Sequence, residues 1–327
     1  MTRHTILSKY AVAAIMLAAV TYTASAQTDT PAMPFLRMET DARTAGLGGA
    51  GSVLPDNPAA IYGNAAVSVL GESCGGATLF TGPWGNSVSD SGHDALYGAG
   101  GYWTPDGRNG IVAGLRCYGG SRISLSDDAG FPAGTARPWD LSAEAGYARR
   151  FGKHVAVSLT ARYMRSDFGT DIAPMQGVAF DVGAAFRGSM GSQRQLSWLA
   201  GIHISDIGPN LKGSDGTALH LPSRVSIEGA LLMPFSKNHE INMAADAGCC
   251  FFNGEIYASF GAEYKFLRHG VIRAGYHVES NRGAGSYASV GCGFIVGPVR
   301  CDAAYRLGGN DTDPRNNSVV VSIGFVL

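Results

Sequence analysis

The stretch IYASFGAEYKF, residues 256–266, alternates between apolar side chains and small, polar or charged ones. Successive side chains of a β-strand point to opposite faces, so a period of two predicts a strand with one apolar face. Strands in globular proteins have about 5–6 residues, whereas a tilted membrane strand needs about 9–11. The apolar face holds Ile256, Ala258, Phe260, Ala262, Tyr264 and Phe266, and the other face holds Glu255, Tyr257, Ser259, Gly261, Glu263 and Lys265.

The same alternation recurs from Gly75 to the end of the chain, with turn residues between the segments. An even number of strands brings both ends of a barrel to the same side of a membrane. The fourteen predicted strands are 75–83, 93–104, 108–119, 136–150, 153–167, 175–187, 195–207, 222–234, 238–249, 254–267, 270–279, 285–296, 298–307 and 317–327.

Two architectures accommodate such strands. A soluble sandwich would turn the apolar faces inward, and a transmembrane barrel would turn them outward to lipid. Connections alternate between short turns, such as 105–108 and 151–153, and longer loops, such as 120–135, which is typical of outer-membrane barrels. We therefore predict an all-β fold, a 14-stranded antiparallel transmembrane β-barrel over residues 75–327.

The face opposite the apolar one is rich in charges of both signs, which a sandwich core could not bury without pairing. In a barrel lumen these side chains can pair with one another, and we interpret them as a structural salt-bridge lattice rather than a transport pathway. They are Arg116, Glu144, Arg162, Asp181, Glu228, Asp246, Glu263, Lys265, Arg273, Arg300, Asp302 and Arg306.

The N-terminus has the pattern of a secretory signal peptide. Basic residues precede the short apolar run at 11–20, and the small residues ASA at 24–26 fit a cleavage site before Gln27. The apolar run is too short to cross a bilayer. We predict a signal peptide at 1–26, cleavage, and location in the outer membrane of a Gram-negative bacterium.

The segment DARTAGLGGAG, residues 41–51, contains the G-x-G-x-x-G spacing of dinucleotide-binding loops. Such a loop must follow a buried strand and open a helix. Here a charged stretch precedes it, and Pro55 and Pro58 interrupt any following helix. We interpret the glycines as sites of close backbone packing.

The charge and the motifs of the sequence do not indicate nucleic-acid binding, a metal site or catalysis. The net charge of −1 does not indicate nucleic-acid binding. The histidines do not form a zinc spacing with the cysteines, and no G-x-S-x-G motif is present. His203 and His277, on predicted lumen faces, are interpreted as hydrogen-bonded. We predict no cofactor, no metal site, no catalytic residues and no enzyme activity.

Several stretches resemble the PorV/PorQ family of Bacteroidetes outer-membrane proteins, which is related to FadL-type barrels. FLRMETDARTAGLGGAGSV at 35–53 is similar to the family's opening, and ISDIGPNLKG at 204–213 to a mid-chain N/D-x-G-P pattern. GAEYKF, IRAGYH and VRCDAAYRLGG are similar to its late strands. Asn64 stands where the family has an Asn-Pro-Ala triplet, although Ala65 replaces the proline.

The resemblance implies an N-terminal periplasmic hatch or plug, residues 27–74, in a fourteen-stranded barrel. It also implies a part in type IX protein secretion, in which external loops bind the C-terminal signal domains of cargo and pass cargo to a cell-surface attachment complex. The alternative is a FadL-like transporter of hydrophobic small molecules. The partners implied are outer-membrane lipid and these proteins. The hatch residues implied by resemblance are Asp41, Arg43, Gly48, Gly49 and Asn64.

Six cysteines follow the predicted cleavage site, and one pair has a geometric argument. If Val296 and Gly297 form a two-residue turn, Cys292 and Cys301 lie opposite each other on the apolar faces of two strands, close enough for a disulfide. A small slip in register removes this pair. The alternative is two lipid-facing thiols that act as small hydrophobic side chains.

Overall fold

The computed structural model of the 327-residue chain describes residues 31–84, 94–127, 129–170, 172–191, 196–213, 216–280, 286–308 and 317–327. The predicted signal peptide lies outside the described residues. Within them, no helix has both the length and the apolar character needed to cross a membrane.

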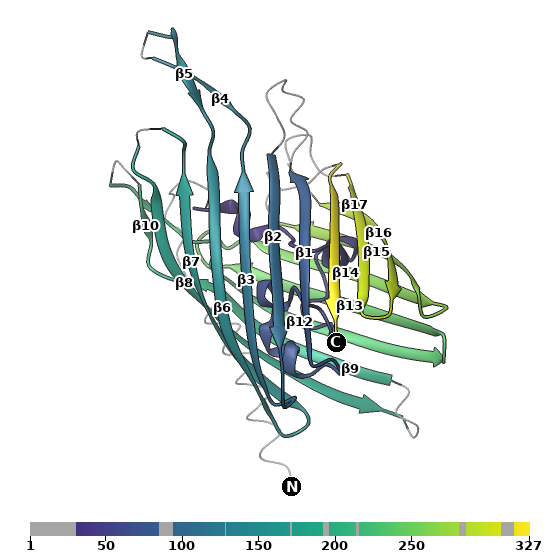
Figure 1. The fold of residues 1–327 in the computed structure, drawn as a ribbon. Coiled ribbons are helices and arrows are strands. Elements are labelled where there is room, and N and C mark those ends of the chain that lie inside the picture. Colours follow the sequence, from purple (N-terminus) through teal and green to yellow (C-terminus); the bar gives the residue numbers. More distant parts are fainter. Residues whose placement is uncertain are drawn as a thin grey trace.

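Fourteen antiparallel strands form one closed barrel, as the sequence predicted (Figure 1). Each strand pairs with the next barrel strand along the chain, and β1 pairs with β18 to close the ring. The strands are β1 Gly75–Trp84, β2 Asp94–Trp103, β3 Asn109–Gly119, β6 Trp139–Phe151, β7 Val155–Asp167, β8 Met175–Met190, β9 Leu196–Ile207, β12 Arg224–Ser236, β13 His239–Cys250, β14 Ile256–Phe266, β15 Gly270–Glu279, β16 Tyr287–Val296, β17 Val299–Leu307 and β18 Val319–Val326.

The two ends of the barrel differ. Short turns such as 104–108, 152–154 and 297–298 join strands at what we call the short-turn end, where β1 begins and β18 ends. The long-loop end carries two small extra hairpins, β4 Ile123–Ser126 with β5 Pro132–Ala136, and β10 Leu211–Lys212 with β11 Ala218–Leu219. The β4–β5 hairpin projects well beyond the other strands (Figure 1).

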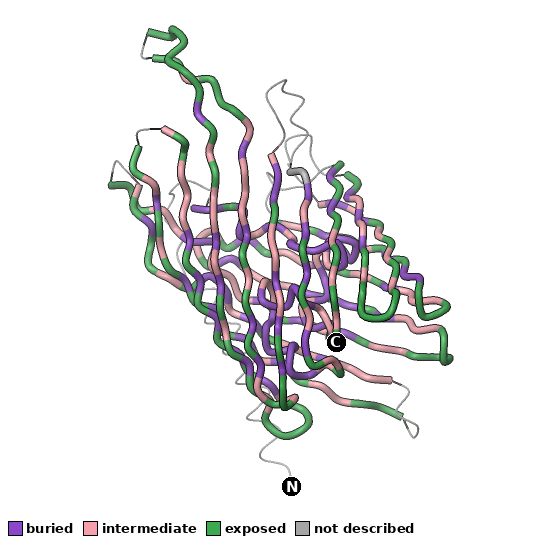
Figure 2. The backbone as a smooth tube through the Cα atoms, viewed as in Figure 1, coloured by how far each residue is buried: buried purple, intermediate pink, exposed green. Residues whose placement is uncertain are grey.

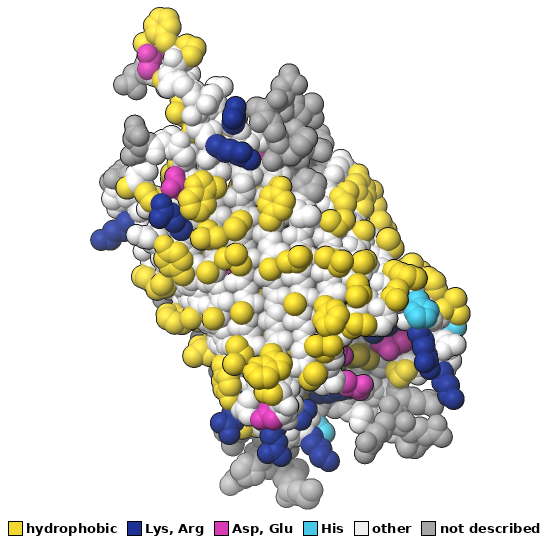
Figure 3. Space-filling model, in the orientation of Figure 1, with side chains coloured by type: hydrophobic (Ala, Val, Ile, Leu, Met, Phe, Trp, Pro, Cys, Tyr) yellow, Lys and Arg dark blue, Asp and Glu magenta, His cyan; other side chains and the backbone are white. Residues whose placement is uncertain are grey.

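More buried and more exposed residues alternate along the strands (Figure 2), because successive side chains point to opposite faces of the wall. Phe260 is 56% exposed, and Ile323 on β18 is 51% exposed, while Glu263 and Arg116 are 0% and 1% exposed. On the face that Figure 3 shows, hydrophobic side chains form a band across the outer wall. The apolar faces therefore point outward and the charged faces inward, which confirms a membrane barrel over a sandwich.

The N-terminal residues 31–74, which we call the lumen segment, run through the inside of the barrel (Figure 1). Their short helices pack on the inner faces of the strands, with α2 against β15 to β18 and η4 against β3 and β6 to β8. The helices are η2 Pro34–Arg37, α2 Ala42–Gly46, η3 Ala60–Tyr62 and η4 Ala65–Val69.

The lumen segment descends from one end of the barrel to the other. The Ala32 N–H donates to the His220 carbonyl, in a long loop, at 2.8 Å, and the Cys74 N–H donates to the Leu327 carbonyl, at the short-turn end, at 2.7 Å. The sequence predicted a hatch or plug at the mouth of the barrel. The described residues of the segment extend beyond one mouth, because those before α2 lie at the long-loop end and Cys74 lies at the short-turn end.

The register of β16 and β17 corrects the predicted cysteine pairing. Cys292 lies opposite Ala303, and Cys301 lies opposite Phe294. The turn is formed by Gly297 and Pro298, and Gly297 takes the positive φ (56°) that a type II′ turn requires at its first position. The predicted direct pairing is therefore wrong by two residues, and both cysteines are exposed free thiols.

An arginine placed on the outer wall tests the membrane orientation. Phe260→Arg puts a charge into hydrocarbon near the middle of β14 and should cost roughly 2–4 kcal/mol of unfolding free energy in lipid vesicles. Phe131→Arg is the control, because Phe131 is 67% exposed but lies in the β4–β5 hairpin. Denaturant unfolding that shows equal losses for the two variants would contradict the orientation.

Candidate functional site

The lumen is organised around three groups of buried polar side chains, each of which joins the lumen segment to the wall. The first is built on Glu263 of β14. Its Oε1 lies 3.0 Å from Nη2 of Arg43 in α2, and its Oε2 lies 2.7 Å from Nε of Arg273 and 3.3 Å from Nη2 of Arg300. Arg43 also donates to the Pro55 carbonyl at 3.0 Å. This is the first part of the predicted salt-bridge lattice.

Arg43 is buried, and burial by itself disfavours its charge. The Glu263 carboxylate outweighs that effect through its charge and hydrogen bonds, so the pKa of Arg43 is raised. Truncation of one partner of such a buried group leaves the other charge uncompensated, which typically costs about 3–5 kcal/mol. The ion pair therefore makes the position of α2 in the lumen specific.

The second group lies near the opposite wall, on the neighbouring strands β3 and β6 to β9. Arg116 Nε donates to Glu144 Oε1 at 3.0 Å, and Arg162 lies 3.1 Å from Glu144 and 2.8 Å from Asp181. Arg162 also pairs with Asp206. Arg116 connects this group to the lumen segment, because its Nη1 donates to the Leu36 carbonyl at 3.2 Å and its guanidinium lies 4.7 Å from the Tyr62 ring centre.

Asp206 was missing from the residues that the sequence predicted to face the lumen. It faces inward because the pairing of β8 with β9 shifts between Phe180 and Val182, and the extra residue of this bulge has a positive φ (58°). Asp206 is the first residue of the D-x-G-P pattern at 206–209. At Gly208, an added Cβ would lie 2.4 Å from the Val178 carbonyl oxygen. The pattern therefore specifies a bulge that supplies a carboxylate to Arg162.

The third group holds the middle of the lumen segment to β12 and β13. Asn64 caps η4 and donates from Nδ2 to Glu228 Oε2 at 2.7 Å. The Ser52 N–H and Oγ donate to Asp246 Oδ2 at 3.0 and 2.7 Å. Glu228 and Asp246 lie directly opposite each other in the register of β12 and β13. Here hydroxyl and amide groups, rather than arginines, hold the carboxylates.

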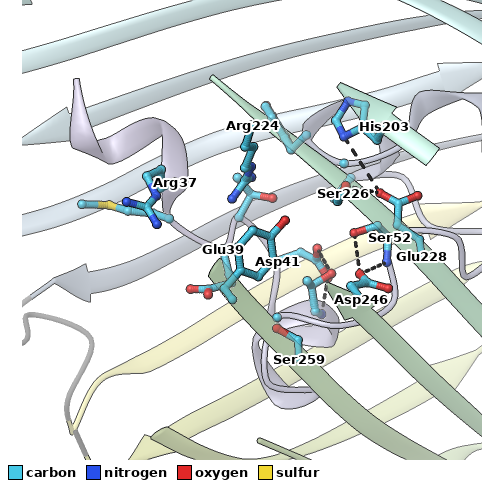
Figure 4. A pocket seen from close by; sticks show the side chains of 18 of the residues that line it. Arg37, Glu39, Asp41, Ser52, His203, Arg224, Ser226, Glu228, Asp246 and Ser259 are labelled. Carbon is cyan, nitrogen blue, oxygen red and sulfur yellow. Dashed lines mark hydrogen bonds and ion pairs between the residues drawn. The ribbon is translucent and has the colours of Figure 1, made fainter. Parts of the chain in front are cut away.

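A cavity of about 100 Å³ lies between the lumen segment and strands β9 and β12 to β15 (Figure 4). It has room for a few water molecules, which need about 30 Å³ each in the liquid. Its lining is mostly polar, and includes Arg37, Glu39, Asp41, Ser52, His203, Arg224, Ser226, Glu228, Asp246 and Ser259. The size and lining are those of a hydrated space, not of a pocket for an apolar molecule.

The two histidines that were predicted to face the lumen do so. His277 Nδ1 lies 2.8 Å from Ser259 Oγ, and His203 Nδ1 lies 4.0 Å from Glu228 Oε1. In the part of the chain that the structure describes, His, Cys, Asp and Glu side chains form no group of three or more that could hold a metal ion.

The predicted hatch residues all lie within the lumen segment, where each has a local role. Asp41 caps α2 by accepting from the Thr44 N–H at 3.0 Å, while Arg43 reaches Glu263 of β14 and Asn64 reaches Glu228 of β12. Gly48 and Gly49 have φ values of 69° and 83°, which disfavour a side chain. An added Cβ at Gly48 would lie 2.5 Å from the Tyr276 nitrogen. Of the three glycines in the G-x-G-x-x-G spacing, Gly46 therefore packs against β16, Gly48 against β15, and Gly51 against Leu54 of the same segment.

The fold resembles that of proteins with solved structures. The chain is similar to a Pseudomonas putida toluene transporter, TodX, with 12% identity and a TM-score of 0.57 over 88% of this chain and 97% of that one. It is also similar to a Pseudomonas aeruginosa FadL homologue, with 13% identity and a TM-score of 0.52 over 87% and 97%. At such identities the likeness shows the fold alone. No curated protein matches the chain.

A closed antiparallel barrel with an apolar outer band and an occupied lumen defines an outer-membrane protein with a FadL-like fold. The sequence identifies the family within that class. The family model for the type IX secretion system protein PorV matches residues 21–249, and the chain belongs to this family. The match confirms the resemblance seen in the sequence.

Removal of the central carboxylate tests the first group. Glu263→Gln keeps the size of the side chain but leaves three arginines without its charge, so we expect a loss of roughly 3–5 kcal/mol in unfolding free energy. Glu240→Gln is the control, because its pair with Lys265, at 2.9 Å, is 28% exposed on both sides and should contribute less than about 1 kcal/mol. Denaturant unfolding in detergent measures both, and equal losses would contradict the proposed importance of Glu263.

A methyl group at Gly48 tests the seating of the lumen segment. Gly48→Ala forces a side chain into a left-handed conformation, at a cost of about 1–2 kcal/mol, and against the backbone of β15. We expect trypsin to cut after Arg43 faster than in the unmodified protein, as measured by mass spectrometry. Gly229→Ala is the control, since its added Cβ meets nothing closer than 3.8 Å. Unchanged cleavage of Gly48→Ala would show that the segment tolerates displacement.

Proposed function

We propose that this protein is a non-enzymatic cargo-binding protein of type IX secretion, which receives the C-terminal signal domains of secreted proteins at its external loops. It hands them to a cell-surface attachment complex. The observation that carries the proposal is the family match over residues 21–249. In this proposal the signal peptide is cleaved after residue 26, and the short-turn end faces the periplasm.

The filled lumen supports a role in which the external loops bind cargo. The lumen segment is bonded to the wall by Arg43, Ser52 and Asn64, and it spans the barrel from the long loops to the short turns. We propose that it acts as a fixed plug, so that the barrel presents loops rather than conducting solutes. The β4–β5 hairpin, with Ile123 and Phe131 53% and 67% exposed, offers apolar contact area outside the membrane.

A hairpin replacement tests this binding role. Replacement of residues 122–137 by Gly-Ser-Gly should weaken binding of a purified cargo C-terminal domain at least about tenfold, because a central apolar contact is typically worth more than 1.4 kcal/mol. Insertion of the same three residues after Lys237, at the short-turn end, is the control. Heat-modifiable migration verifies that both variants fold. Normal surface levels of every cargo in a deletion strain would refute the secretion role.

The second candidate function is transport of hydrophobic small molecules, as named for the toluene transporter with the similar fold. One observation favours it. A groove of about 650 Å³ on the outer wall crosses β18, β1, β2 and β3, where the floor is made of small residues such as Ala99, Gly101 and Ala113. Behind it, Tyr62 of the lumen segment donates to the carbonyls of Ala99 and Leu115.

The two functions make different predictions for this wall. Ala99→Trp fills the groove from outside without touching the loops. If the chain is a transporter, this variant lowers uptake of an aromatic hydrocarbon relative to the unmodified protein. If it is a secretion protein, uptake in the deletion strain equals that of the parent, and the variant keeps normal cargo levels at the surface.

A further inference from the structure

The short-turn end carries a group of basic side chains on neighbouring strands, which we call the rim patch: Arg108, Arg149, Arg150 and Lys153. Arg108 precedes β3, the next two end β6, and Lys153 lies in the turn to β7. These strands are adjacent in the barrel. Arg108, Arg149 and Lys153 are exposed. Figure 3 shows Lys and Arg side chains gathered at this lower end of the barrel, below the hydrophobic band.

The rim patch is not neutralised by the rest of the protein. None of its four cations lies within 4 Å of a carboxylate among the described residues, and the buried Nε of Arg150 has no hydrogen-bond partner there. The nearby Asp106 carboxylate accepts bonds from its own turn, from the Arg108 and Asn109 N–H groups at 2.9 and 2.7 Å. Four cations and this one anion give a formal charge of 4 − 1 = +3.

The other ends of these strands carry charges of both signs. Asp94 begins β2, Asp140 lies near the start of β6 and Asp167 ends β7, and Arg122, Arg137 and Arg165 lie at the same long-loop end. There Arg165 Nη2 pairs with Asp167 Oδ2 at 3.3 Å. The rim patch differs because, among the described residues, its cations have no such carboxylate partner.

The rim patch also lies at the level of the membrane boundary. Arg149 has the outward parity of its strand, between Tyr147 and Phe151, which are 46% and 53% exposed on the outer wall. Its guanidinium carbon is 5.6 Å from the Phe151 ring centre. Trp103, paired with Ile111 on β3, adds a third exposed aromatic ring nearby, at 59% exposure. Aromatic rings with outward arginines beside them are typical of the lipid headgroup region.

From this arrangement we infer that the rim patch binds the phosphate headgroups of anionic phospholipids in the leaflet at the short-turn end. Arg149 projects sideways from the wall, toward lipid neighbours, and not along the barrel axis toward a protein in the adjacent compartment. Arginine offers paired N–H donors that match phosphate oxygens, and Lys153 adds a point charge. The aromatic rings contact the acyl chains just inside the same boundary. The lipid contact fixes the depth of the barrel at this end.

The experiment titrates the full-length mature protein, in non-ionic detergent, with phosphatidylglycerol and separately with phosphatidylcholine, and counts bound lipids by native mass spectrometry. Each Lys or Arg near an anionic lipid surface contributes roughly a fivefold factor in affinity. Arg149→Gln with Lys153→Gln should therefore weaken phosphatidylglycerol binding about 30-fold and leave phosphatidylcholine binding unchanged. Arg137→Gln with Lys212→Gln, which removes one Arg and one Lys at the long-loop end, should leave both unchanged.

Any of three results would overturn the inference. The first is equal binding of the two lipids by the unmodified protein, and the second is unchanged phosphatidylglycerol binding by the Arg149 and Lys153 variant. The third is complete displacement of the lipid by millimolar inorganic phosphate, which would indicate a site for the free ion. A photo-crosslinker at position 153 that labels an acidic protein in cells, with no lipid preference in vitro, would assign the patch to a protein partner instead. Heat-modifiable migration verifies that each variant is folded.

Discussion

Hydrocarbon cannot hydrogen-bond, and this constraint decides on which face of the barrel wall the charged side chains of the strands lie. The strands satisfy their backbone groups in a closed ring, which leaves the outer faces free for apolar side chains. The charged faces are then forced into one narrow lumen, where unpaired charges are costly. Arg43, Ser52 and Asn64 of the lumen segment complete pairings that the wall alone lacks. The lumen segment and the inner faces of the strands therefore form one polar core, and the outer faces of the strands form an apolar surface around it.

The polar core also accounts for the motif that resembles a nucleotide loop. Gly48 and Gly49 adopt conformations that disfavour a side chain, and Gly48 approaches β15 at a distance that a side chain would prevent. Asp41, a few residues earlier, caps α2 and so orients Arg43 toward Glu263. The spacing of glycines thus reflects a short helix pressed against a strand, and the same spacing in a nucleotide-binding protein reflects the approach of a phosphate.

The sequence was sufficient to predict the strands, because a period of two over segments this long has few other solutions. It predicted the side of the wall on which Glu263, Arg273 and Arg300 lie, but not which of them meet. Ion pairing depends on the shear of the barrel and on the depth of the lumen segment, which no local pattern encodes. Asp206 was missed because a bulge breaks the alternation on which the prediction relied. The pairing of Cys292 with Cys301 failed because one turn residue shifts a whole hairpin register.

The direction of the lumen segment has a consequence for assembly. Residues that come before β1 in the chain reach the far mouth of the barrel, where Ala32 bonds to a loop, and then return to Cys74 beside the C-terminal Leu327. A finished cylinder would have to be threaded by this segment along its whole length. It is simpler for an open, curling sheet to wrap around the segment, so that zipping of the β1–β18 seam is the last event and encloses the contents.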